Sequence, residues 1–521
     1  MKLMNWGNIE VVVEPDIELI SDASHLEDMA AISTKTTIQR KPAKEVSNEL
    51  KKKLVINTAK AGHLTVFMND NIIFSLYGLS RQATTTIHYL LEHYNTSQSS
   101  DRYNYLGEKS EGTRKPRVSL PPQMTKHEDI LKPYFLEMWE NYQEMLKILQ
   151  DYIYGKIKNS PNPKYNVNDE KLRKIAKKTA TQYARIVFPA ASSSSMIFSL
   201  NIIELARLYI ISKKIDFGDE FSSLVDAMYS KVKPYVPNFN EIVEKELKNI
   251  MSFDILENKI NPLEDYKKEF SKMAENVIVN PMSEKELLSR LDTAFFSIHG
   301  RHLNISELVD EIIKFYSTSF GLQNVSPTLK SLESIHFTFA EEMTQYEFEQ
   351  SVRHRKVRHF TNLFLPAMFE EPDFVIPKLI SGIPTAVNLL NKSMKRAWEV
   401  RKELLERGEK MSNILSVLPR GIKYRVVKTS DLKNYLHESL LRLCMNAQQE
   451  INYHKYMEMK KLNELYPSLK GIFAPRCVYR RILGLTPYCP EMSENGIGRW
   501  CGYPMWDNWE KMSEKLKKRE F

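Results

Sequence analysis

The same order of predicted elements occurs twice along the chain, and this repetition constrains the fold more than any other feature of the sequence. Val11-Val-Val-Glu-Pro15 and Val277-Ile-Val-Asn-Pro281 each predict a short β-branched strand that ends in a turn. The segments that follow each of them have the same apolar spacing and matching prolines. The matched pairs are helices over 17–32 and 284–298, strands over 72–77 and 335–339, long amphipathic helices over 129–154 and 385–405, Pro-centred strands over 186–189 and 416–419, and apolar helices over 201–211 and 431–443.

We interpret this repetition as a tandem duplication. The predicted fold is α+β, with two homologous domains that are each a β-sheet flanked by long α-helices. The first repeat is expected over 1–235 and the second over 272–490, with a helical connector over 236–271 and a C-terminal tail over 491–521. The alternative is two α/β segments that share only a generic order of elements. The matching prolines favour duplication.

Composition narrows the classes of function. The 521 residues include 74 Lys or Arg and 65 Asp or Glu, for a net charge of +9, which suits a nucleotide phosphate, a dinucleotide or a nucleic acid. No apolar run approaches the ~20 residues of a membrane span. Met1–Glu10 has no basic head with an apolar run behind it, so secretion is not expected. With four cysteines and no need for a disulfide framework, a cytoplasmic protein is predicted.

The densest cationic cluster is Arg353-His354-Arg355. Two guanidiniums that flank an imidazole suit a diphosphate, because each guanidinium binds two phosphate oxygens at once. A solvated basic face is the plainer interpretation. The apolar neighbours Val352 and Phe360 favour an interface instead.

Gln350-x-x-Arg-His-Arg355, placed after the strand-like Phe337-Thr-Phe339, resembles the signature of the flavin-dependent thymidylate synthases. In that family the Arg-His-Arg triplet is followed at a fixed distance by Ser-x-Arg-Tyr. The second half departs from the pattern there, because Leu363-Phe-Leu-Pro366 occupies those positions.

The first half shows the reverse pattern. The segment that begins at Gln98 contains Ser100, Arg102 and Tyr103 and fits Ser-x-Arg-Tyr, but Leu90-Leu-Glu92 stands where the triplet belongs. Gly62-His-Leu-Thr65 resembles the Gly-His-x-Thr lead-in of the family.

The later family pattern is an Ala-Arg-x-x-Leu-Pro segment, then Asn-x-Arg, then a helix that ends in Arg. The first half keeps Arg185 and Asn201 but has Ile203 and Ser212 at the two later basic positions. The second half has the basic residues Lys433 and Arg442 there, and its Ala447-Gln-Gln-Glu-Ile451 resembles the Ala-Gln-x-Glu-Ile of the family.

Each half therefore keeps what the other has lost. The resemblance implies a homotetramer whose sites are assembled at subunit contacts, so a duplicated chain is expected to build one composite site from its two incomplete halves. Two chains are then expected to pair as a homodimer that imitates the tetramer. The alternative is decay, with no complete site. Random decay would often strike the same position in both halves, and mostly it has not.

The resemblance assigns roles residue by residue. The expected substrate-binding residues are Gln98, Ser100, Arg102, Arg185, Gln350 and Arg353. The expected cofactor-binding residues are Thr65, Asn201, Arg353, His354, Arg355 and Lys433. Arg442 is expected to be catalytic, because a fixed cation stabilises negative charge that grows on a pyrimidine ring.

The implied activity is reductive C5 methylation of dUMP or a related pyrimidine nucleotide. The implied cofactor is FAD, with NADPH and methylenetetrahydrofolate as co-substrates. The alternative function is a non-catalytic or repurposed paralogue that binds flavin or nucleotide. Nucleic-acid binding rests on the basic balance alone and is not expected.

Three cysteines, Cys477, Cys489 and Cys501, are evenly spaced near the C-terminus. Three thiolates and a fourth ligand are able to hold zinc, but the spacing is not the tight Cys-x-x-Cys of a strong zinc signal. We therefore expect free or weakly packed thiols and no metal.

Overall fold

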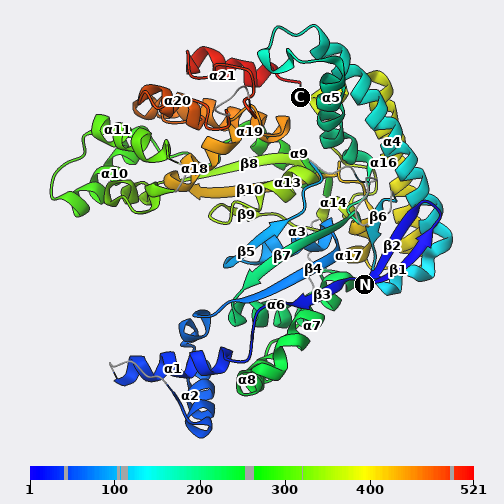
Figure 1. Cartoon of the computed structure of the whole chain (residues 1–521), viewed down its shortest axis with the longest axis vertical. Coiled ribbons are helices and arrows are strands. Elements are labelled where there is room, and N and C mark those ends of the chain that lie inside the picture. The colour runs from blue at the N-terminus through cyan, green and yellow to red at the C-terminus, as the bar shows by residue number, and fades with distance from the viewer. Residues whose placement is uncertain are drawn as a thin grey trace.

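The computed structural model describes residues 1–39, 45–102, 106, 115–252, 263–318, 321–492 and 498–520. The chain is a mixed α/β protein in which two main sheets lie one above the other in Figure 1, with helices packed around both. In the same view α4, α5 and α16 lie along one side of the two sheets. No helix among these residues is long and apolar enough to cross a membrane.

The sheet of the first half has the strand order β3-β4-β7-β5, and all its neighbours are antiparallel. Ile72, Phe74 and Leu76 alternate toward the core, as a strand with one buried face requires. A smaller sheet of order β1-β2-β6 lies beside it. The strands are β1 (Lys2–Trp6), β2 (Ile9–Glu14), β3 (Asp16–Leu19), β4 (Ile72–Ser80), β5 (Tyr94–Gln98), β6 (Arg117–Ser119) and β7 (Ser193–Leu200).

The sheet of the second half has the order β8-β10-β9 and is also antiparallel. Its strands are β8 (His336–Thr344), β9 (Arg358–Phe360) and β10 (Lys423–Asp431). The pairing of β8 with β10 runs unbroken from Thr344 opposite Lys423 to His336 opposite Asp431. The long central pair β8–β10 thus has the same arrangement as β4–β7 in the first half.

The helices of the first half and the connector are α1 (Leu26–Gln39), α2 (Asn48–Lys60), α3 (Arg81–Leu90), α4 (Glu128–Lys158), α5 (Asp169–Ala184), α6 (Ile202–Lys214), α7 (Asp219–Val232), α8 (Pro237–Asn249) and α9 (Leu263–Glu275). Those that follow are α10 (Glu284–His299), α11 (Ile305–Tyr316), α12 (Pro327–Lys330), α13 (Gln345–Ser351), α14 (Leu365–Met368), α15 (Lys378–Ser381), α16 (Pro384–Glu406), α17 (Met411–Ile414), α18 (Leu432–Arg442), α19 (Gln449–Leu465), α20 (Arg476–Ile482) and α21 (Trp509–Lys518).

Equivalent helices begin with equivalent caps. Ser80 and Thr344 end the strands β4 and β8, and each side chain accepts a hydrogen bond from a main-chain N–H in the first turn of the next helix. Asn201 and Asp431 do the same after β7 and β10. Such caps satisfy donors that a helix leaves unpaired at its N-terminus, so both halves turn from strand to helix in the same way.

The two halves meet at Pro189 and Pro419, which lie opposite each other in an isolated antiparallel bridge. Four main-chain hydrogen bonds surround this bridge, and they form two pairs. Within each pair, the half that donates in one bond accepts in the other. The four bonds are Ala190 N to Leu418 O at 2.9 Å, Arg420 N to Phe188 O at 3.1 Å, Ala191 N to Ser416 O at 2.6 Å and Gly421 N to Ile186 O at 3.0 Å. The junction is therefore locally two-fold symmetric.

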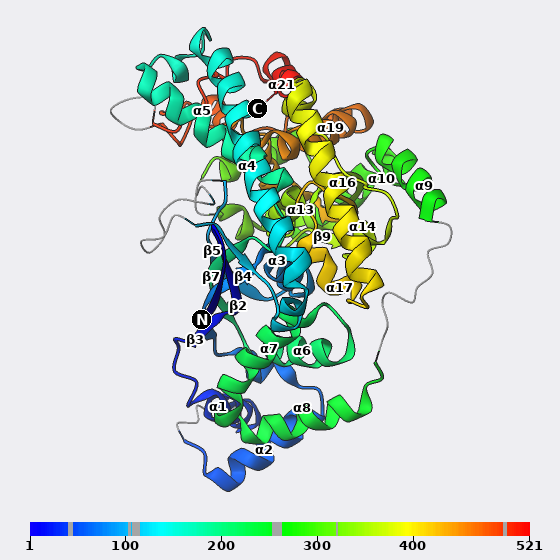
Figure 2. The same ribbon diagram turned by 90° about the vertical axis from the view of Figure 1, so that its right-hand side faces the viewer.

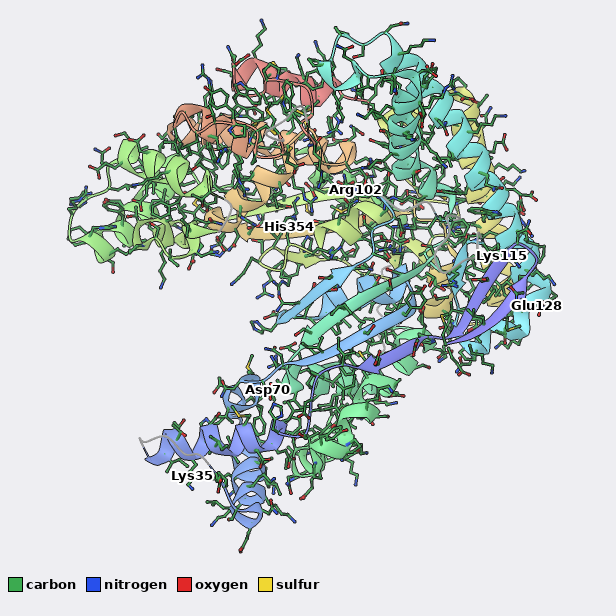
Figure 3. The ribbon with its side chains drawn as sticks, in the orientation of Figure 1. Lys35, Asp70, Arg102, Lys115, Glu128 and His354 are labelled. Atoms are coloured by element: carbon green, nitrogen blue, oxygen red, sulfur yellow. The ribbon has the colours of Figure 1, made fainter. Side chains whose placement is uncertain are left out.

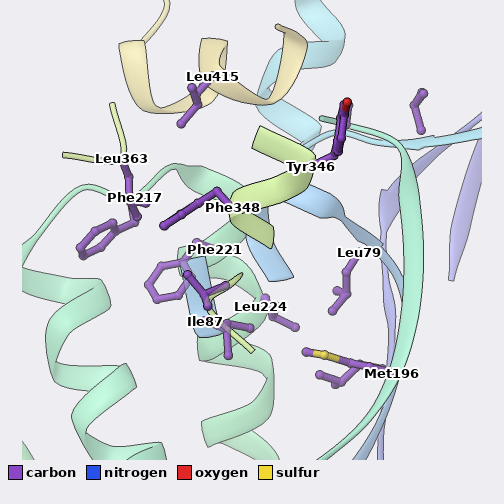
Figure 4. Close-up of a cluster of buried hydrophobic side chains, with 14 of the residues drawn as sticks. Leu79, Ile87, Met196, Phe217, Phe221, Leu224, Tyr346, Phe348, Leu363 and Leu415 are labelled. Atoms are coloured by element: carbon purple, nitrogen blue, oxygen red, sulfur yellow. The ribbon is translucent and has the colours of Figure 1, made fainter. Parts of the chain in front are cut away.

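Apolar packing joins the halves at this junction. The larger core contains Leu79, Phe221 and Leu224 from the first half and Phe348 and Leu363 from the second. Figure 4 shows these side chains directed at one another from strands and helices of both halves. Helices α4 and α16 pack side by side, as Figure 2 shows. Between them, the side-chain amide of Asn141 donates a hydrogen bond to the hydroxyl of Ser393. A second, smaller core lies wholly after residue 277.

Most of the expected long helices are confirmed, as α4, α16, α6 and α18. The Pro-centred strands are wrong: Arg185–Val187 and Leu415–Val417 are 3₁₀ helices. Proline has no N–H to donate to a strand ladder, and β-pairing between the two segments is limited to the isolated bridge of Pro189 with Pro419.

The expected starts of the two repeats also need correction. Residues 16–19 form β3 rather than the first turn of a helix, and α1 begins only at Leu26. Residues 277–281 contain no extended strand, because Val277 and Asn280 have positive φ, and only Ile278 pairs with β8.

Candidate active site

A basic cleft of about 1080 Å³ lies between α4 and α5 of the first half and the segments around 446 and 500–520. Ten Lys or Arg side chains line its described part against one carboxylate, Glu520. The cations are Arg102, Lys156, Lys164, Lys171, Lys174, Lys178, Arg499, Lys515, Lys518 and Arg519. Such a concentration of positive charge favours an anionic ligand.

Arg102 reaches across the boundary between the halves. Its Nε donates to Gln182 Oε1 at 3.2 Å, and one terminal nitrogen donates to the main-chain oxygen of Asn446 at 3.2 Å. Gln182 belongs to α5, whereas Asn446 follows α18. The side chain of Arg102 is therefore held by both halves at the edge of the basic cleft.

Arg185 and Gln350 meet at one acceptor, Gln448 Oε1. Arg185 donates to this oxygen at 2.7 Å and Gln350 Nε2 donates to it at 2.8 Å. The Nε2 of Gln448 in turn donates to Glu450. Gln350 Oε1 is buried and has no hydrogen-bond partner among the described residues, which marks a polar position that a ligand is able to satisfy.

Glu450 is a buried carboxyl that also accepts a hydrogen bond from Tyr346. Burial, together with the nearby charge of Glu347, raises the pKa of Glu450 to about 7. Arg185 stacks over the Tyr346 ring at 4.7 Å. Burial lowers the pKa of Arg185 to about 10, so this cation is already short of solvation before a ligand arrives.

Arg442 ends α18 and contacts the triplet directly. Its Nε donates to His354 Nε2 at 2.9 Å, and a terminal nitrogen donates to the main-chain oxygen of Gln350 at 3.2 Å. Burial and the adjacent Arg442 lower the pKa of His354 to about 3. His354 is therefore neutral and serves as a hydrogen-bond acceptor that orients Arg442.

The cations of the two halves are close enough to repel one another. Burial lowers the pKa of Arg442, and the negative charge of Glu438 opposes this effect. The positive charges of Arg102 and Arg353 repel Arg442 and lower its pKa further. Figure 3 shows Arg102 and His354 near each other at the boundary between the halves. Crowded, partly desolvated guanidiniums bind a phosphate dianion strongly, because the ligand relieves their repulsion.

A second cleft of about 270 Å³ lies between the triplet and the first-half sheet. Arg353 and Arg355 face Tyr94, Ser97 and Ser199 across it, and Arg355 lies 5.4 Å from the centroid of the Tyr94 ring. Two exposed guanidiniums with hydroxyls and an aromatic ring suit the phosphates of a cofactor such as FAD, so the residues present fit that part of the group.

Five other expected site residues remain, and four of them have local partners. Gln98 donates to Thr84 and Ser194, and Ser100 accepts from the main-chain N–H of Arg102. Asn201 caps α6, and Thr65 is exposed in the 3₁₀ helix Leu64–Met68, which packs on α6.

The fifth, Lys433, pairs with Glu333 at the start of α18. Arg442 ends the same helix, about 14 Å away along its axis at 1.5 Å per residue. The structure therefore does not bring Lys433 to the triplet, and Tyr103 lies outside the described residues.

A buried ion network holds the halves together behind the cleft. Asp101 accepts from Arg81 of the first half and, at 2.7 Å, from Arg420 of the second. Arg420 is completely buried and also pairs with Glu349. Asp101 precedes Arg102, so this network fixes the position of the residue that enters the cleft.

Reasoning from sequence missed Gln448, Asn446 and Arg420. Gln448 lies inside the Ala447–Ile451 stretch that resembles the family, so a signal for it was present. Asn446 contributes a main-chain oxygen, and Arg420 is a lone arginine after Pro419, so neither carries a sequence signal.

Comparison with known proteins places the chain in a family. Residues 18–238 and 307–468 match the family described as "Thymidylate synthase complementing protein". The flavin-dependent thymidylate synthase of Pyrococcus abyssi is 31% identical over 194 residues, which cover 35% of this chain and 76% of the relative. That of Clostridium tetani is 29% identical over 198 residues, covering 38% of this chain and 72% of the relative.

Among solved structures, a UMP/dUMP methylase PolB from Streptomyces cacaoi bound with 5-Br dUMP is 13% identical, with a TM-score of 0.32, and the match covers 45% of this chain and 97% of that one. The matched family segments span more than half of the chain and include Arg102, Arg185, Gln350, the triplet and Arg442. The chain belongs to the thymidylate synthase complementing protein family, that of the flavin-dependent thymidylate synthases.

Proposed function

We propose that this protein is a flavin-dependent enzyme that methylates C5 of dUMP or a closely related pyrimidine nucleotide. The observation that carries the proposal is the convergence of Arg102 and Arg185 from the first half with Gln350 and Arg442 from the second. Their hydrogen bonds meet at Asn446 and Gln448. The curated relatives are flavin-dependent thymidylate synthases, and solved neighbours hold dUMP or its analogues.

The proposed site is composite, and the chain is a tandem duplication with one site per chain. The symmetric bonds around Pro189 and Pro419 support the duplication. The division of cations between the halves supports the composite site: Arg102 is held by the main chain of the second half, and Arg185 by a side chain of the second half. Neither half alone supplies both sets.

In the proposed mechanism, Arg102 and Arg185 bind the nucleotide phosphate. Gln350, with its unsatisfied Oε1, is placed to accept a hydrogen bond from the pyrimidine or sugar. Arg442 is oriented by neutral His354 and stabilises the negative charge that grows on the pyrimidine as C5 becomes nucleophilic. Because Arg442 is already desolvated, its electrostatic effect on that charge is larger than in water.

Arg353 and Arg355 would hold the flavin phosphates in the cleft beside Tyr94. The flavin supplies the redox chemistry when bound. NADPH as electron donor and methylenetetrahydrofolate as one-carbon donor are proposed co-substrates. The proposed compartment is the cytoplasm, and the proposed assembly is a homodimer.

A second candidate is a paralogue that binds flavin or nucleotide without turnover. One observation favours it: Asn201 and Lys433, two of the expected cofactor contacts, are engaged with Glu204 and Glu333. The purified chain is expected to carry flavin and to convert dUMP to dTMP when folate and reductant are supplied. Bound flavin and bound dUMP without turnover would support the paralogue, whereas a colourless protein that binds neither would reject both candidates.

A further inference from the structure

The basic cleft is larger and more positive than a nucleoside monophosphate requires. Its volume of about 1080 Å³ exceeds the roughly 300–1,000 Å³ of pockets that enclose a drug-sized ligand. Arg102, the proposed partner of the nucleotide phosphate, is one of ten cations that line its described part. A phosphate dianion is neutralised by one or two guanidiniums, so most of these cations are not needed to bind dUMP.

Three of the cations form a row on α5. Lys171, Lys174 and Lys178 are exposed and line the cleft. Gln182, the hydrogen-bond partner of Arg102, lies on the same helix face, because steps of three or four residues along an α-helix keep side chains together. From Lys171 to Gln182 the row extends about 16 Å at 1.5 Å per residue. The row therefore begins where the nucleotide phosphate would bind and leads away from it.

A second set of cations comes from the end of the chain. Lys515, Lys518 and Arg519 line the same cleft, and α21 lies near α5 in Figures 1 and 2. Burial lowers the pKa of Lys164, and the positive charges of Arg519 and Lys178 lower it further. Cations from α5 and from the end of the chain thus both repel Lys164, and a polyanion in the cleft would relieve this repulsion.

The carboxylates near these cations compete weakly with a ligand. Three of the lining cations pair with carboxylates at the surface, namely Lys174 with Glu170 at 2.6 Å, Lys156 with Glu520 at 3.8 Å and Arg499 with Glu491 at 3.4 Å. Exposed ion pairs of this kind contribute little free energy, because water and salt screen them. The lining side chains are therefore able to exchange these partners for phosphates.

Aromatic rings lie among the cations of the cleft. Tyr165, Trp500 and Tyr503 line it, and each is partly exposed. Lys515 Nζ lies 4.9 Å from the centroid of the Tyr503 ring, and Lys164 Nζ lies 5.8 Å from that of Tyr165. A positive groove interleaved with aromatic rings is typical of proteins that bind single-stranded nucleic acid, because bases stack on the rings while the cations contact the phosphates.

We propose that the cleft binds single-stranded DNA, with the target pyrimidine nucleotide at Arg102 and the chain on its 5′ side along α5. The inference rests on the proposed function, because it starts from the phosphate of the nucleotide to be methylated. Net charge alone does not favour nucleic acid, but the fold gathers ten of the 74 basic residues around the described part of one cleft.

The length of the row favours a DNA strand over smaller anions. About 16 Å matches roughly five phosphates of a stacked strand at about 3.4 Å per residue. A nucleoside triphosphate is shorter than the row and would leave Lys171 without a phosphate. A polycarboxylate of the same length would meet the lysines, but it carries no bases to stack on Tyr165, Trp500 and Tyr503.

The test is equilibrium binding of dUMP, dUTP and a DNA single strand to the full flavin-loaded chain. The strand is about six residues long, matched to the row at about 3.4 Å per residue, and has deoxyuridine at its 3′ end. It should bind at least about tenfold more tightly than dUTP, because only the strand reaches the far lysines and the rings. A strand with deoxyuridine at its 5′ end should bind less tightly than the first.

The outcomes separate this inference from the proposed function. If dUMP binds and the strand binds no more tightly than dUTP, the DNA site is wrong and the nucleotide site stands. If neither dUMP nor the strand binds, both are wrong, whereas a strand that binds without dUMP supports the DNA site and rejects free dUMP. Equal affinity for the two strands would overturn the direction of the chain, and tighter binding of γ-linked oligoglutamate or of RNA would overturn the choice of DNA.

A triple variant tests the row itself. With Lys171, Lys174 and Lys178 all changed to Ala, the slope of log affinity for the strand against log salt should become shallower by about 2, since each phosphate contact to a single strand contributes about 0.7. The affinity for dUMP should not change.

The matched control changes Lys51, Lys52 and Lys53 of α2 to Ala, which removes the same charge at the opposite end of the molecule in Figures 1 and 2. This control should keep the salt slope of the unmodified chain. An unchanged slope in the α5 variant, or an equal change in both variants, would show that the row does not contact the strand and would overturn the proposal.

Discussion

The two halves share a backbone plan but carry different side chains at positions 230 residues apart. At the junction, Ala190 of the first half corresponds to Arg420 of the second, and only Arg420 reaches Asp101. At the end of the last matched helix, Ser212 donates to Tyr209 within its own helix, whereas Arg442 reaches His354.

The comparison shows that two halves are able to share symmetric main-chain bonds while their polar side chains differ. Main-chain bonds at Pro189 and Pro419 depend little on side-chain identity, so both halves form them. A ligand site needs each cation only once, so the equivalent position in the other half does not need the same cation.

The largest expected effect comes from breaking the asymmetric contact at the junction. Arg420→Ala leaves Asp101 and Glu349 buried without this cation and should lower the free energy of unfolding by about 3–5 kcal/mol. Urea unfolding measures this loss. The matched control is Arg407→Ala, which removes exposed pairs with Asp129 and Glu403 and should cost far less, because water and salt screen exposed charges. Equal losses would show that the junction does not depend on Arg420.

The next effect concerns turnover. Arg442→Ala should lower kcat by about 10²–10³-fold with a smaller change in nucleotide affinity, because its proposed role grows as charge develops on the ring. Steady-state kinetics and equilibrium binding of dUMP separate the two effects. Ser212→Ala, at the equivalent position of the first half, is the control and should leave kcat unchanged. A loss confined to binding would place Arg442 among the binding residues instead.

The smallest expected effect is on the pH dependence of stability, and it is tested at two buried carboxyls. Burial raises the pKa of both Glu220 and Glu450 to about 7. A carboxyl with a raised native pKa binds more protons in the folded state, so stability falls as pH rises from about 4.5 to about 7. Glu220→Gln removes this fall in stability. Its free energy of unfolding at pH 8 should be higher than that of the unmodified chain by at least about 1.4 kcal/mol, the value of one pKa unit. Unfolding at pH 5 and pH 8 measures it.

Glu450→Gln should raise the free energy of unfolding at pH 8 by less than Glu220→Gln does. Glu220 accepts from Ser80 N, a bond that the amide oxygen of Gln retains. Glu450 accepts from both Tyr346 and Gln448, and a single amide oxygen serves this pair poorly. An equal gain at both positions would indicate that the network around Gln448 adds nothing to stability.

The sequence predicted the strands β4 and β8, the four long or apolar helices and the family, because these rest on apolar periodicity and on local motifs. It did not predict that residues around Pro189 and Pro419 form 3₁₀ turns that meet each other, because a short apolar run is equally compatible with a strand. Arg420 and Asp101 escaped notice for a related reason: their pairing spans 319 positions and leaves no local pattern.

The residues of the candidate site divide in the same way, into those that local motifs predicted and those whose contacts depend on the fold. Arg102, Arg185, Gln350 and Arg442 were predicted from motifs, and the structure brings them together. The partners of Asn201 and Lys433 depend on Glu204 and Glu333, whose positions only the fold supplies.

The central claim is that both halves contribute to one nucleotide site, and the affinity of the flavin-loaded Arg102→Ala chain for dUMP tests it most directly. Loss of a charged hydrogen bond of this kind costs about 1.5–3 kcal/mol, so dUMP should bind roughly ten- to a hundredfold more weakly. Flavin content should be unchanged, and Arg173→Ala, which removes an exposed arginine of α5 paired with Asp169, should bind dUMP normally. Unchanged dUMP affinity in a folded, flavin-loaded Arg102→Ala chain would contradict the composite site and favour decay of the two copies.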